Sequence, residues 1–284
     1  MTWLVILSSL VIAQATGSQG PAATGRGQDE VLSIRQLDVG QGDAALITTP
    51  EGRRILIDAG PNAHQVAGIL RSEGIDTVDL MVASHAHADH IGGMPAVFFA
   101  VTVRAYMDNG IPHTTATYAR TIAAAEREPG LQYLAATDRT ITLGSATVRV
   151  LPPPRVDGSQ NNNSVGLLIE YGDFSALYTG DSERRELTHW LRAEPIPSVE
   201  LVKAAHHGAR NGVTANWVEA TAPQLVLIPA GSRNRYGHPS PFALQLWTAG
   251  GARIYRTDQM GEIEVKARRD GTFTVHLSTD RGGR

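Results

Sequence analysis

The chain has 284 residues and a formal net charge of −3, with 42% hydrophobic and 19% charged residues. Such a composition supports a sizeable core and excludes collagen-like, low-complexity and wholly disordered chains. The balanced charge excludes a generally basic nucleic-acid coat, although it is compatible with a local basic patch. Because the sequence contains no cysteine, disulfides, thiol nucleophiles and thiolate metal sites are excluded. Any bound metal must therefore be held by His, Asp, Glu or Asn.

The first residues have the pattern of a secretory signal peptide. Residues 4–13 are an apolar run, shorter than the roughly 20 residues that span a bilayer, and Ala13-Gln14-Ala15 is a small-x-small cleavage pattern. No Lys or Arg precedes the run, so a mis-assigned start codon and a short apolar strand are the alternatives. We expect a signal peptide at 1–15, then a flexible linker at 16–29. The expected location is periplasmic or extracellular without stable membrane insertion, or cytoplasmic if the segment is not a signal.

No long linker interrupts residues 30–278, which are expected to form one domain. Apolar runs bounded by Gly and Pro predict strands, and segments of helical composition predict helices between them. The expected strands are, in chain order, 31–37, 44–48, 54–57, 78–84, 147–151, 165–171, 174–179, 199–203, 225–229, 263–266 and 273–277. The expected helices are 64–71, 113–127, 183–191, 217–220 and 242–249. This succession predicts a layered α/β sandwich whose functional residues lie on loops at strand ends.

Four side chains that can bind a metal fall within six residues, directly after the expected buried strand 78–84. They are His85, His87, Asp89 and His90. Imidazole and carboxylate form the ligand set of Zn²⁺, Mn²⁺ or Fe. On one turn, ligands at positions i and i+2 can face one metal while those at i+4 and i+5 face a second. A lone histidine is usually a satisfied polar residue, whereas this concentration predicts a metal centre.

The motif resembles the HxHxDH signature of the metallo-β-lactamase superfamily of hydrolases. Other segments are similar to one branch of it, the soluble hydrolase domain of the competence protein ComEC, and occur in the same order between residues 31 and 266. They are LDVGQGDA at 37–44, IDAG at 57–60, NNNS at 161–164, TGD at 179–181, VKAAHHG at 202–208, NRYGHP at 234–239 and YRTD at 255–258. The resemblance implies a four-layer αββα sandwich with a metal site at the edge of its sheets.

The resemblance also implies a cofactor of two divalent metal ions, Zn or Mn. The implied ligands are His85 and His87 for the first metal, Asp89, His90 and His206 for the second, and Asp181 as the bridge.

Further residues receive candidate roles from their place in these motifs. Asp58 would orient the ligand loop from behind, and His207 would face the substrate. Gln41 and Asp43 are candidates for a role near the metals, with simple turn chemistry as the alternative. Lys203 and His238 are candidates to contact a phosphate or a developing charge, with solvated surface positions as the alternative. Asn161 is either a site residue or part of a polar loop.

Two positions depart from the superfamily pattern. Many members hold the first metal with a third histidine between the HxHxDH motif and the bridging aspartate. Here the candidate is His113, which falls in the expected helix 113–127, while no histidine stands near Asn161. Asp43 and Asn161 are the alternatives for an oxygen ligand. Ala86 replaces a proline that is common in this branch, which we expect only to loosen the loop.

Two adjacent divalent metals can activate a bridging water and clamp the attacking and leaving oxygens, so no protein nucleophile is required. Asp89 would orient this water or accept its proton, with Asp43, Lys203 and His207 as further catalytic candidates. The resemblance implies a phosphodiesterase or nuclease acting on single-stranded DNA outside the cytoplasm, with a separate membrane channel as a partner. The alternatives are a small-molecule ester or amide hydrolase of the lactonase or β-lactamase type, and a non-catalytic metal-dependent binding module.

Overall fold

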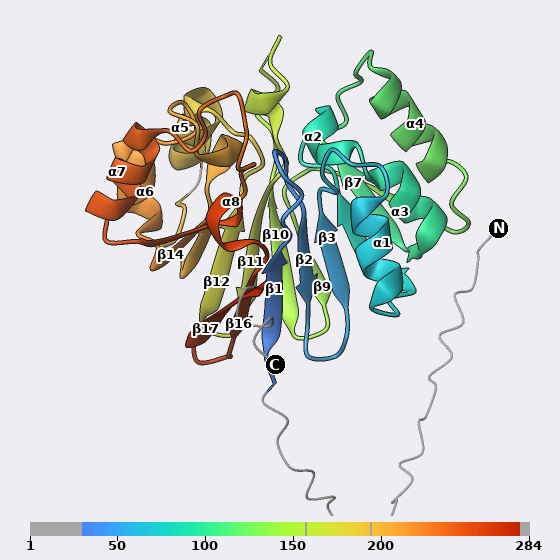
Figure 1. The fold of residues 1–284 in the computed structure, drawn as a ribbon, viewed down its shortest axis with the longest axis horizontal. Coiled ribbons are helices and arrows are strands. Elements are labelled where there is room, and N and C mark those ends of the chain that lie inside the picture. The colour runs from blue at the N-terminus through green and yellow to red at the C-terminus, as the bar shows by residue number, and fades with distance from the viewer. Residues whose placement is uncertain (1–29, 157, 194, 279–284) are drawn as a thin grey trace, which may run out of the picture.

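The computed structural model describes residues 30–156, 158–193 and 195–278. The expected signal peptide at 1–15 and linker at 16–29 lie outside these residues. The described chain forms two large β-sheets packed face to face, each covered on its outer side by helices (Figure 1). This is the four-layer αββα sandwich that the sequence predicts. Within the described ranges, no helix combines the length and the apolar character needed to cross a membrane.

One sheet contains strands from the first half of the chain and the last two strands. Its spatial order is β17 (Phe273–Leu277), β16 (Ile263–Ala267), β1 (Leu32–Gln36), β2 (Ala45–Thr48), β3 (Arg54–Ile57), β5 (Leu80–Val82), β7 (Ala105–Asp108) and β8 (Gln132–Ala135). The strands from β17 to β3 are antiparallel, whereas β3, β5, β7 and β8 run parallel. Because parallel strands need crossover connections, helices lie on the outer face. These helices are α1 (Gln65–Ser72), α2 (Ala88–Ile91), α3 (Met94–Ala100) and α4 (Ala116–Ala125).

The second sheet belongs to the later part of the chain. Its order is β15 (Arg253–Arg256), β14 (Leu225–Ile228), β13 (Leu201–Lys203), β12 (Phe174–Tyr178), β11 (Gly166–Tyr171), β10 (Ala146–Leu151) and β9 (Arg139–Leu143). Strands β12 to β15 are parallel, and β9 to β12 are antiparallel. Its outer helices are α5 (Arg184–Ala193), α6 (Ala215–Thr221) and α7 (Pro241–Ala249), at the left of Figure 1. The remaining short elements are β4 (Thr77–Val78), β6 (Thr102–Val103), η1 (Asn161–Asn163), η2 (Ala205–Gly208) and α8 (Thr257–Met260).

The alternation of side chains along each strand divides the core into layers. Leu167 and Ile169 of β11 point into the apolar layer between the two sheets, whereas Leu168 points to the helices on the other face. Leu80 and Met81 of β5 are divided in the same way. Since successive side chains of a strand point to opposite faces, a strand covered on both sides must be apolar throughout. This explains the continuous apolar runs in the sequence.

The structure differs from two sequence expectations. The expected strand 78–84 is divided at Asp79, whose carboxylate accepts a hydrogen bond from the Arg54 backbone N–H at 2.8 Å and binds the Arg53 and Arg104 guanidinium groups. The expected helix 113–127 begins only at Ala116, because the hydroxyl of Thr115 caps its first turn. His113 therefore lies in the loop before α4.

Parallel strands of both sheets end at the same edge of the sandwich. In one sheet β3 leads to Asp58 and β5 to the histidine-rich motif, and in the other β12 leads to Asp181 and β13 to η2. In Figure 1 this edge is at the top, where α2 of one half and α5 of the other lie. Carboxyl ends of parallel strands are the usual place for binding residues in α/β folds. The four segments carry most of the metal ligands that the resemblance implies.

Candidate metal centre

The HxHxDH motif straddles the start of a short helix. His87 stands in extended backbone at the N-terminus of α2, His85 precedes it, and His90 lies inside the helix, so one short segment carries all three imidazoles. The segment is held against the loop after β3, since the Ala59 backbone N–H donates to the His90 carbonyl oxygen at 2.7 Å. A Cβ atom at Gly93 would stand 2.3 Å from the Ala59 carbonyl oxygen, so only glycine permits this approach.

Asp58 orients His90 from behind. Its carboxylate accepts hydrogen bonds from the Ser84 backbone N–H at 2.8 Å, from Ser84 Oγ at 2.7 Å and from His90 Nδ1 at 2.7 Å. A carboxylate can only accept, so the proton of the neutral His90 ring stays on Nδ1 and its Nε2 lone pair is free to bind a metal. This geometry fits the orienting role that the resemblance implies for Asp58.

Asp181 is placed by a tight turn after β12. Its backbone N–H donates to Ser164 Oγ at 3.1 Å. Gly180, with φ +52°, packs so closely that a Cβ atom there would stand 2.8 Å from both Ser164 Oγ and Ser84 Cβ. The Thr-Gly-Asp turn therefore joins the two loops that carry the other site residues, and it directs the Asp181 carboxylate between them.

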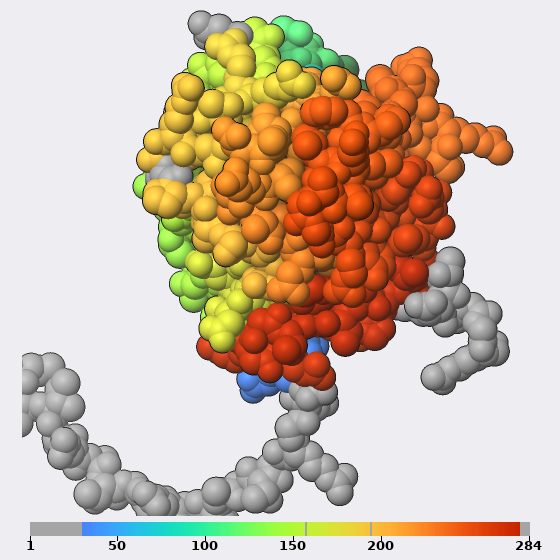
Figure 2. All heavy atoms as spheres, turned by 90° about the vertical axis from the view of Figure 1, so that its left-hand side faces the viewer, coloured from blue at the N-terminus to red at the C-terminus, as the bar shows by residue number. Residues whose placement is uncertain are grey.

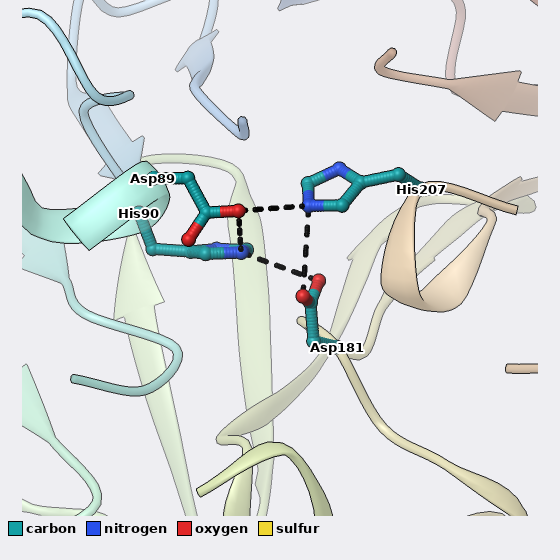
Figure 3. A group of neighbouring side chains, drawn as sticks. All are labelled: Asp89, His90, Asp181 and His207. Carbon is teal, nitrogen blue, oxygen red and sulfur yellow. Dashed lines mark ion pairs between the residues drawn. The ribbon is translucent and has the colours of Figure 1, made fainter. Parts of the chain in front are cut away.

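Asp89, His90, Asp181 and His207 point toward one another (Figure 3). One ligand atom from each lies within 4.8 Å of the others. His90 Nε2 is 3.3 Å from Asp181 Oδ1, and His207 Nε2 is 3.4 Å from Asp89 Oδ2 and 3.5 Å from Asp181 Oδ2. His207 Nδ1 is hydrogen-bonded to the Pro229 carbonyl oxygen at 3.0 Å, which leaves Nε2 as the free nitrogen.

Three of these converging atoms are buried and have no hydrogen-bond partner, namely His90 Nε2, His207 Nε2 and Asp181 Oδ1. Buried polar atoms are rarely left unpaired, because each costs about 1–3 kcal/mol. Two imidazole nitrogens and carboxylate oxygens aimed at one point also match the ligand chemistry of a divalent cation. The residues present therefore fit a metal ion at this position.

The order of the two neighbouring histidines differs from the sequence prediction. His206 was expected to complete the second metal site, with His207 facing the substrate. In the structure His207 joins the cluster with Asp89 and His90, and His206 Nε2 lies 3.8 Å from Asp181 Oδ2. Both residues adopt left-handed backbone conformations, with φ of +51° and +54°. Such a turn, which is uncommon for residues other than glycine, sets directions that sequence spacing does not encode.

A second group of nitrogens lies on the other side of Asp181. His85 Nε2 is 3.0 Å from His87 Nδ1 and 4.0 Å from Asp181 Oδ2, the oxygen that His206 Nε2 also faces. Asp181 Oδ1 is the oxygen nearest to His90. One buried carboxylate thus contacts histidines of both groups, with Oδ1 facing His90 and Oδ2 facing His85, His206 and His207.

The structure separates the alternatives for an additional oxygen ligand. Asp43 Oδ1 accepts from Gln36 Nε2 at 3.1 Å, and its other oxygen contacts the Lys203 ammonium. Asn161 Nδ2 lies 3.5 Å from His206 Nε2, and its Oδ1 is buried without a hydrogen-bond partner. Asn161 Oδ1 therefore has no hydrogen-bond partner, whereas each oxygen of Asp43 has one polar contact. The His113 ring centre stands 6.1 Å from that of His87, so this histidine reaches the rim of the site from its loop.

Lys203 is not at the substrate side of the site. It is 1% exposed, donates to the Gly180 carbonyl oxygen at 2.8 Å and contacts Asp43. Burial disfavours its charge, but Asp43 and Asp181 outweigh this effect and raise the pKa of the ammonium group. The alternative that Lys203 is a solvated surface position is therefore wrong, because both Lys203 and Asp43 are buried. They form a buried ion pair behind Asp181, because Lys203 is the last residue of a strand covered on both sides.

Charges within the site favour the metal-binding protonation state of several groups, but not of His90. Although burial disfavours its charge, Asp181, Asp58 and Asp89 raise the pKa of His90 well above its ordinary value, so a metal must displace its proton. Burial and the neighbouring His90 hold the pKa of His85 well below its ordinary value, so His85 is neutral and can offer a lone pair. Burial alone would raise the pKa of Asp181, but His90 and His207 outweigh burial and hold it well below its ordinary value. Asp89 is shifted in the same direction, again because His90 outweighs burial. Both carboxylates are therefore ionised at neutral pH.

Of two other predicted residues, His238 belongs to the loop between β14 and α7, and Gln41 contacts this loop from the β1–β2 turn. Gln41 Oε1 accepts from the Gly231 backbone N–H at 3.1 Å and so ties this loop to the β1–β2 turn. His238 is half-buried, and its ring centre is 5.3 Å from that of His206 and 6.3 Å from that of His207. Burial and these two histidines lower the pKa of His238 to about 4, so it is neutral at physiological pH.

Sequence reasoning did not single out two residues that support the site. Ser164 Oγ accepts from the Asp181 backbone N–H, and the buried Glu186 carboxylate accepts from the Ser164 backbone N–H at 3.2 Å. Ser164 is the last residue of the NNNS segment, and the place of that segment among the motifs could have pointed to it. Glu186 occupies an ordinary helix position, and nothing in its neighbours along the chain marks it as buried.

Comparisons with known proteins identify the family. The profile of the Metallo-beta-lactamase superfamily matches residues 37–220, more than half of the chain. The chain belongs to the metallo-β-lactamase superfamily. It is therefore a metal-dependent hydrolase of this superfamily.

Two competence proteins are similar to this superfamily member over most of its length. ComE operon protein 3 of Bacillus subtilis is 28% identical over 269 residues, which cover 87% of this chain and 34% of that protein. Competence protein ComA of Neisseria gonorrhoeae is 28% identical over 245 residues, which cover 84% of this chain and 33% of that protein. The chain thus spans about a third of the length of these relatives. The ComEC-like resemblance of the sequence motifs is confirmed.

Solved structures confirm the metallo-β-lactamase fold. The metallo-beta-lactamase fold protein YhfI from Bacillus subtilis superposes with a TM-score of 0.53 at 13% identity, covering 79% of this chain and 95% of that one. CmlA, a diiron beta-hydroxylase from Streptomyces venezuelae, superposes with a TM-score of 0.53 at 17% identity. The superposition covers 86% of this chain and 55% of that one. At such low identity these likenesses describe the fold alone.

Proposed function

We propose that this protein is a binuclear metal-dependent phosphodiesterase that cleaves single-stranded DNA, with Zn²⁺ or Mn²⁺ as its metal. The observation that carries the binuclear assignment is the position of Asp181, whose Oδ1 faces His90 and whose Oδ2 faces His85, His206 and His207. The similarity to competence proteins supports DNA as the substrate. In this proposal His207 takes the ligand position of the second metal that the sequence assigned to His206.

Two bound divalent ions supply an activated water and stabilise the charge that develops on the phosphoryl oxygens. The protein's own groups position the substrate and hold the proton. Asp89 has a side chain that is 35% exposed, whereas Asp181 is buried, so Asp89 is the carboxylate of the cluster that an entering water can reach. Because its pKa lies below its ordinary value, Asp89 is ionised and can accept a hydrogen bond from that water and so orient it.

His238 is suited to bind substrate and not to act as a base. Its Nδ1 is buried without a hydrogen-bond partner, and its lowered pKa keeps the ring neutral. A neutral imidazole carries one N–H, which can donate to a phosphate oxygen of the substrate. Asp43 and Lys203 contribute indirectly, since their ion pair lies behind Asp181 and holds its carboxylate in place.

A panel of three substrates tests this function. Purified protein is freed of metal with a chelator, reloaded with Mn²⁺ or Zn²⁺, and offered labelled single-stranded DNA, bis-nitrophenyl phosphate and a chromogenic β-lactam. We expect cleavage of both phosphodiesters, loss of activity in the chelated protein and recovery on reloading. Hydrolysis of the β-lactam without phosphodiester cleavage would assign the small-molecule alternative, and full activity without metal would contradict the metal-dependent proposal.

We also propose that the protein acts outside the cytoplasm, next to a separate membrane channel that handles the DNA. The support is the apolar run at 4–13 followed by Ala13-Gln14-Ala15. Cleavage there would leave Thr16 as the mature N-terminus. N-terminal sequencing of the native protein after cell fractionation tests this, and intact Met1 in the cytosolic fraction would contradict export.

A further inference from the structure

Tyr236 is an exposed aromatic side chain on the loop that borders the metal cluster. Among the residues that the structure describes, three large hydrophobic side chains are exposed: Phe99, Tyr133 and Tyr236, the last at 59%. Tyr236 belongs to the loop between β14 and α7, and Figure 2 shows orange atoms of this part of the chain projecting from the body at the upper right. A large aromatic ring left in water beside a site is a candidate contact for a ligand.

The ring of Tyr236 ends a column of rings that begins in the metal cluster. His207 and His238 have ring centres 6.3 Å apart and planes inclined by 26°. The ring centres of His238 and Tyr236 are 5.8 Å apart, and their planes are inclined by 27°. Three neighbouring rings thus lead from a buried cluster residue to the solvent. A flat group packed against the exposed part of the Tyr236 ring would extend this series outward from the metal cluster.

The loop holds Tyr236 rigidly, although the ring itself is exposed. Asn234 Nδ2 donates to the carbonyl oxygens of Gly231 and His238, both at 2.7 Å, and Asn234 Oδ1 accepts from the His238 backbone N–H at 3.0 Å. Gln41 ties Gly231 to the opposite turn. The side chain of Asn234 therefore closes the loop around Tyr236. Such a preorganised ring loses little conformational entropy when a ligand packs against it.

The surroundings of Tyr236 are basic, although the whole chain has a net charge of −3. The Arg235 guanidinium lies 5.6 Å from the Tyr236 ring centre. Between Glu219 and Asp258 the sequence contains no Asp or Glu, whereas it contains Arg233 and Arg235 in this loop. An aromatic ring flanked by arginine is the combination that proteins use to bind single-stranded nucleic acid, with bases stacked on the ring and phosphates on the cations.

We propose that Tyr236 is a stacking platform for a nucleobase of the strand bound at the metals, and that Arg235 binds a backbone phosphate near that base. This inference rests on the proposed function and adds a specificity-determining residue to it. Base stacking is tolerant of sequence because every base has a flat face. The platform would accordingly select a nucleic acid strand over other phosphodiesters without reading a particular base. A duplex, whose bases are already stacked, would bind less well.

The test compares two oligonucleotides of equal length, an oligothymidylate and an abasic strand with the same phosphates but no bases. Fluorescence anisotropy with chelated protein gives their Kd values, and KM and kcat follow with Mn²⁺-loaded protein. We expect the wild type to bind the oligothymidylate at least about tenfold more tightly than the abasic strand. Tyr236→Ala should abolish this difference and raise KM for the oligothymidylate only, while Tyr236→Phe and Tyr236→Trp retain it.

Phe99→Ala is the matched control, since Phe99 is 90% exposed on α3 and is not part of the loop that borders the metals. This variant should keep the preference for the strand with bases. If Tyr236→Ala folds normally and keeps that preference, the platform is elsewhere and the inference is wrong. If the wild type cleaves both strands with equal Kd and KM, the phosphodiesterase stands and the stacking inference fails. If it neither binds nor cleaves either strand, the proposed function fails, and the inference fails with it.

Discussion

His90 Nδ1 lies 2.7 Å from Asp58 Oδ2, and both side chains are buried between the metal cluster and the core. This contact determines which nitrogen of His90 faces the metals. The same carboxylate also holds Ser84, so three groups depend on it. A substitution at Asp58 should therefore act on metal affinity without touching a ligand.

Asp58→Asn should lower metal affinity by about 10- to 100-fold, the usual cost of losing a group that orients a ligand. An amide retains one acceptor oxygen but brings a donor against groups that themselves donate. Competition with a chromogenic chelator measures the affinity. Asp76→Asn, at an exposed position, is the control. Equal affinities in the two variants would mean that Asp58 has no orienting role.

Asp181→Asn should reduce bound metal to one per chain or fewer and lower turnover by at least about a hundredfold, some 2.7 kcal/mol. The amide keeps the shape of the side chain but removes the charge that offsets repulsion between two cations. That repulsion is roughly 4 kcal/mol for unit charges 4 Å apart at an effective dielectric of 20. Elemental analysis of folded protein counts the metals. Two metals with near-normal turnover would show that Asp181 does not bridge.

His207→Ala and His206→Ala should differ in which of the two metals they lose. His207 Nε2 is within 3.5 Å of two cluster carboxylates, whereas His206 Nε2 is 3.8 Å from one. We expect His207→Ala to remove the metal held by Asp89 and His90, and His206→Ala to weaken mainly the metal held by His85 and His87. Calorimetric metal titration separates the two binding steps. The opposite pattern would restore the order predicted from sequence.

Lys203→Met should destabilise the protein by about 3–5 kcal/mol, because it leaves the buried Asp43 carboxylate without its cation. A double variant, Lys203→Met with Asp43→Leu, should recover part of this loss, since no unpaired charge is then buried. Urea denaturation in the presence of a chelator measures the free energy of unfolding without a contribution from metal. A single variant as stable as the wild type would contradict the buried ion pair.

Glu186 makes stability depend on pH. Burial raises the pKa of its carboxyl well above the ordinary value of 4.5, so the folded state keeps the proton to a higher pH than the unfolded state. Its contribution to stability is fully present below pH 4.5 and is lost as the pH rises through the raised pKa. Glu186→Gln should therefore be more stable than the wild type at pH 8, by on the order of 1 kcal/mol or more.

At pH 4 the same variant should have no advantage, because the wild-type carboxyl is then neutral in both states. Thermal and urea unfolding at the two pH values measure this, with Glu126→Gln at an exposed position of α4's end as the control. A stability difference that does not change with pH would show that Glu186 is ionised in the fold.

The layers of the fold could be predicted from sequence because burial on both faces demands apolar residues throughout a strand. Segments such as β11 and β14 stand out for that reason. The short helices α2 and α3 and the strands β7 to β9 were not predicted. The helix α2 has four residues, one of which is a charged aspartate, so its helical backbone comes from tertiary contacts and not from a periodic pattern.

The sequence by itself determined the family, the metal chemistry and the identity of the ligand types. Closely spaced His and Asp residues on Ala and Gly-rich turns have few uses other than metal binding, and the motifs keep their order. Only the tertiary structure decided which side chain faces which way. Consecutive residues such as His206 and His207 differ in role because a left-handed turn directs them apart. Lys203 lies behind the site, and not in it, because its strand is covered on both faces. The direction and burial of a side chain depend on contacts between segments more than a hundred residues apart, such as those of Asp43 and Lys203. A local pattern of residues does not predict such contacts.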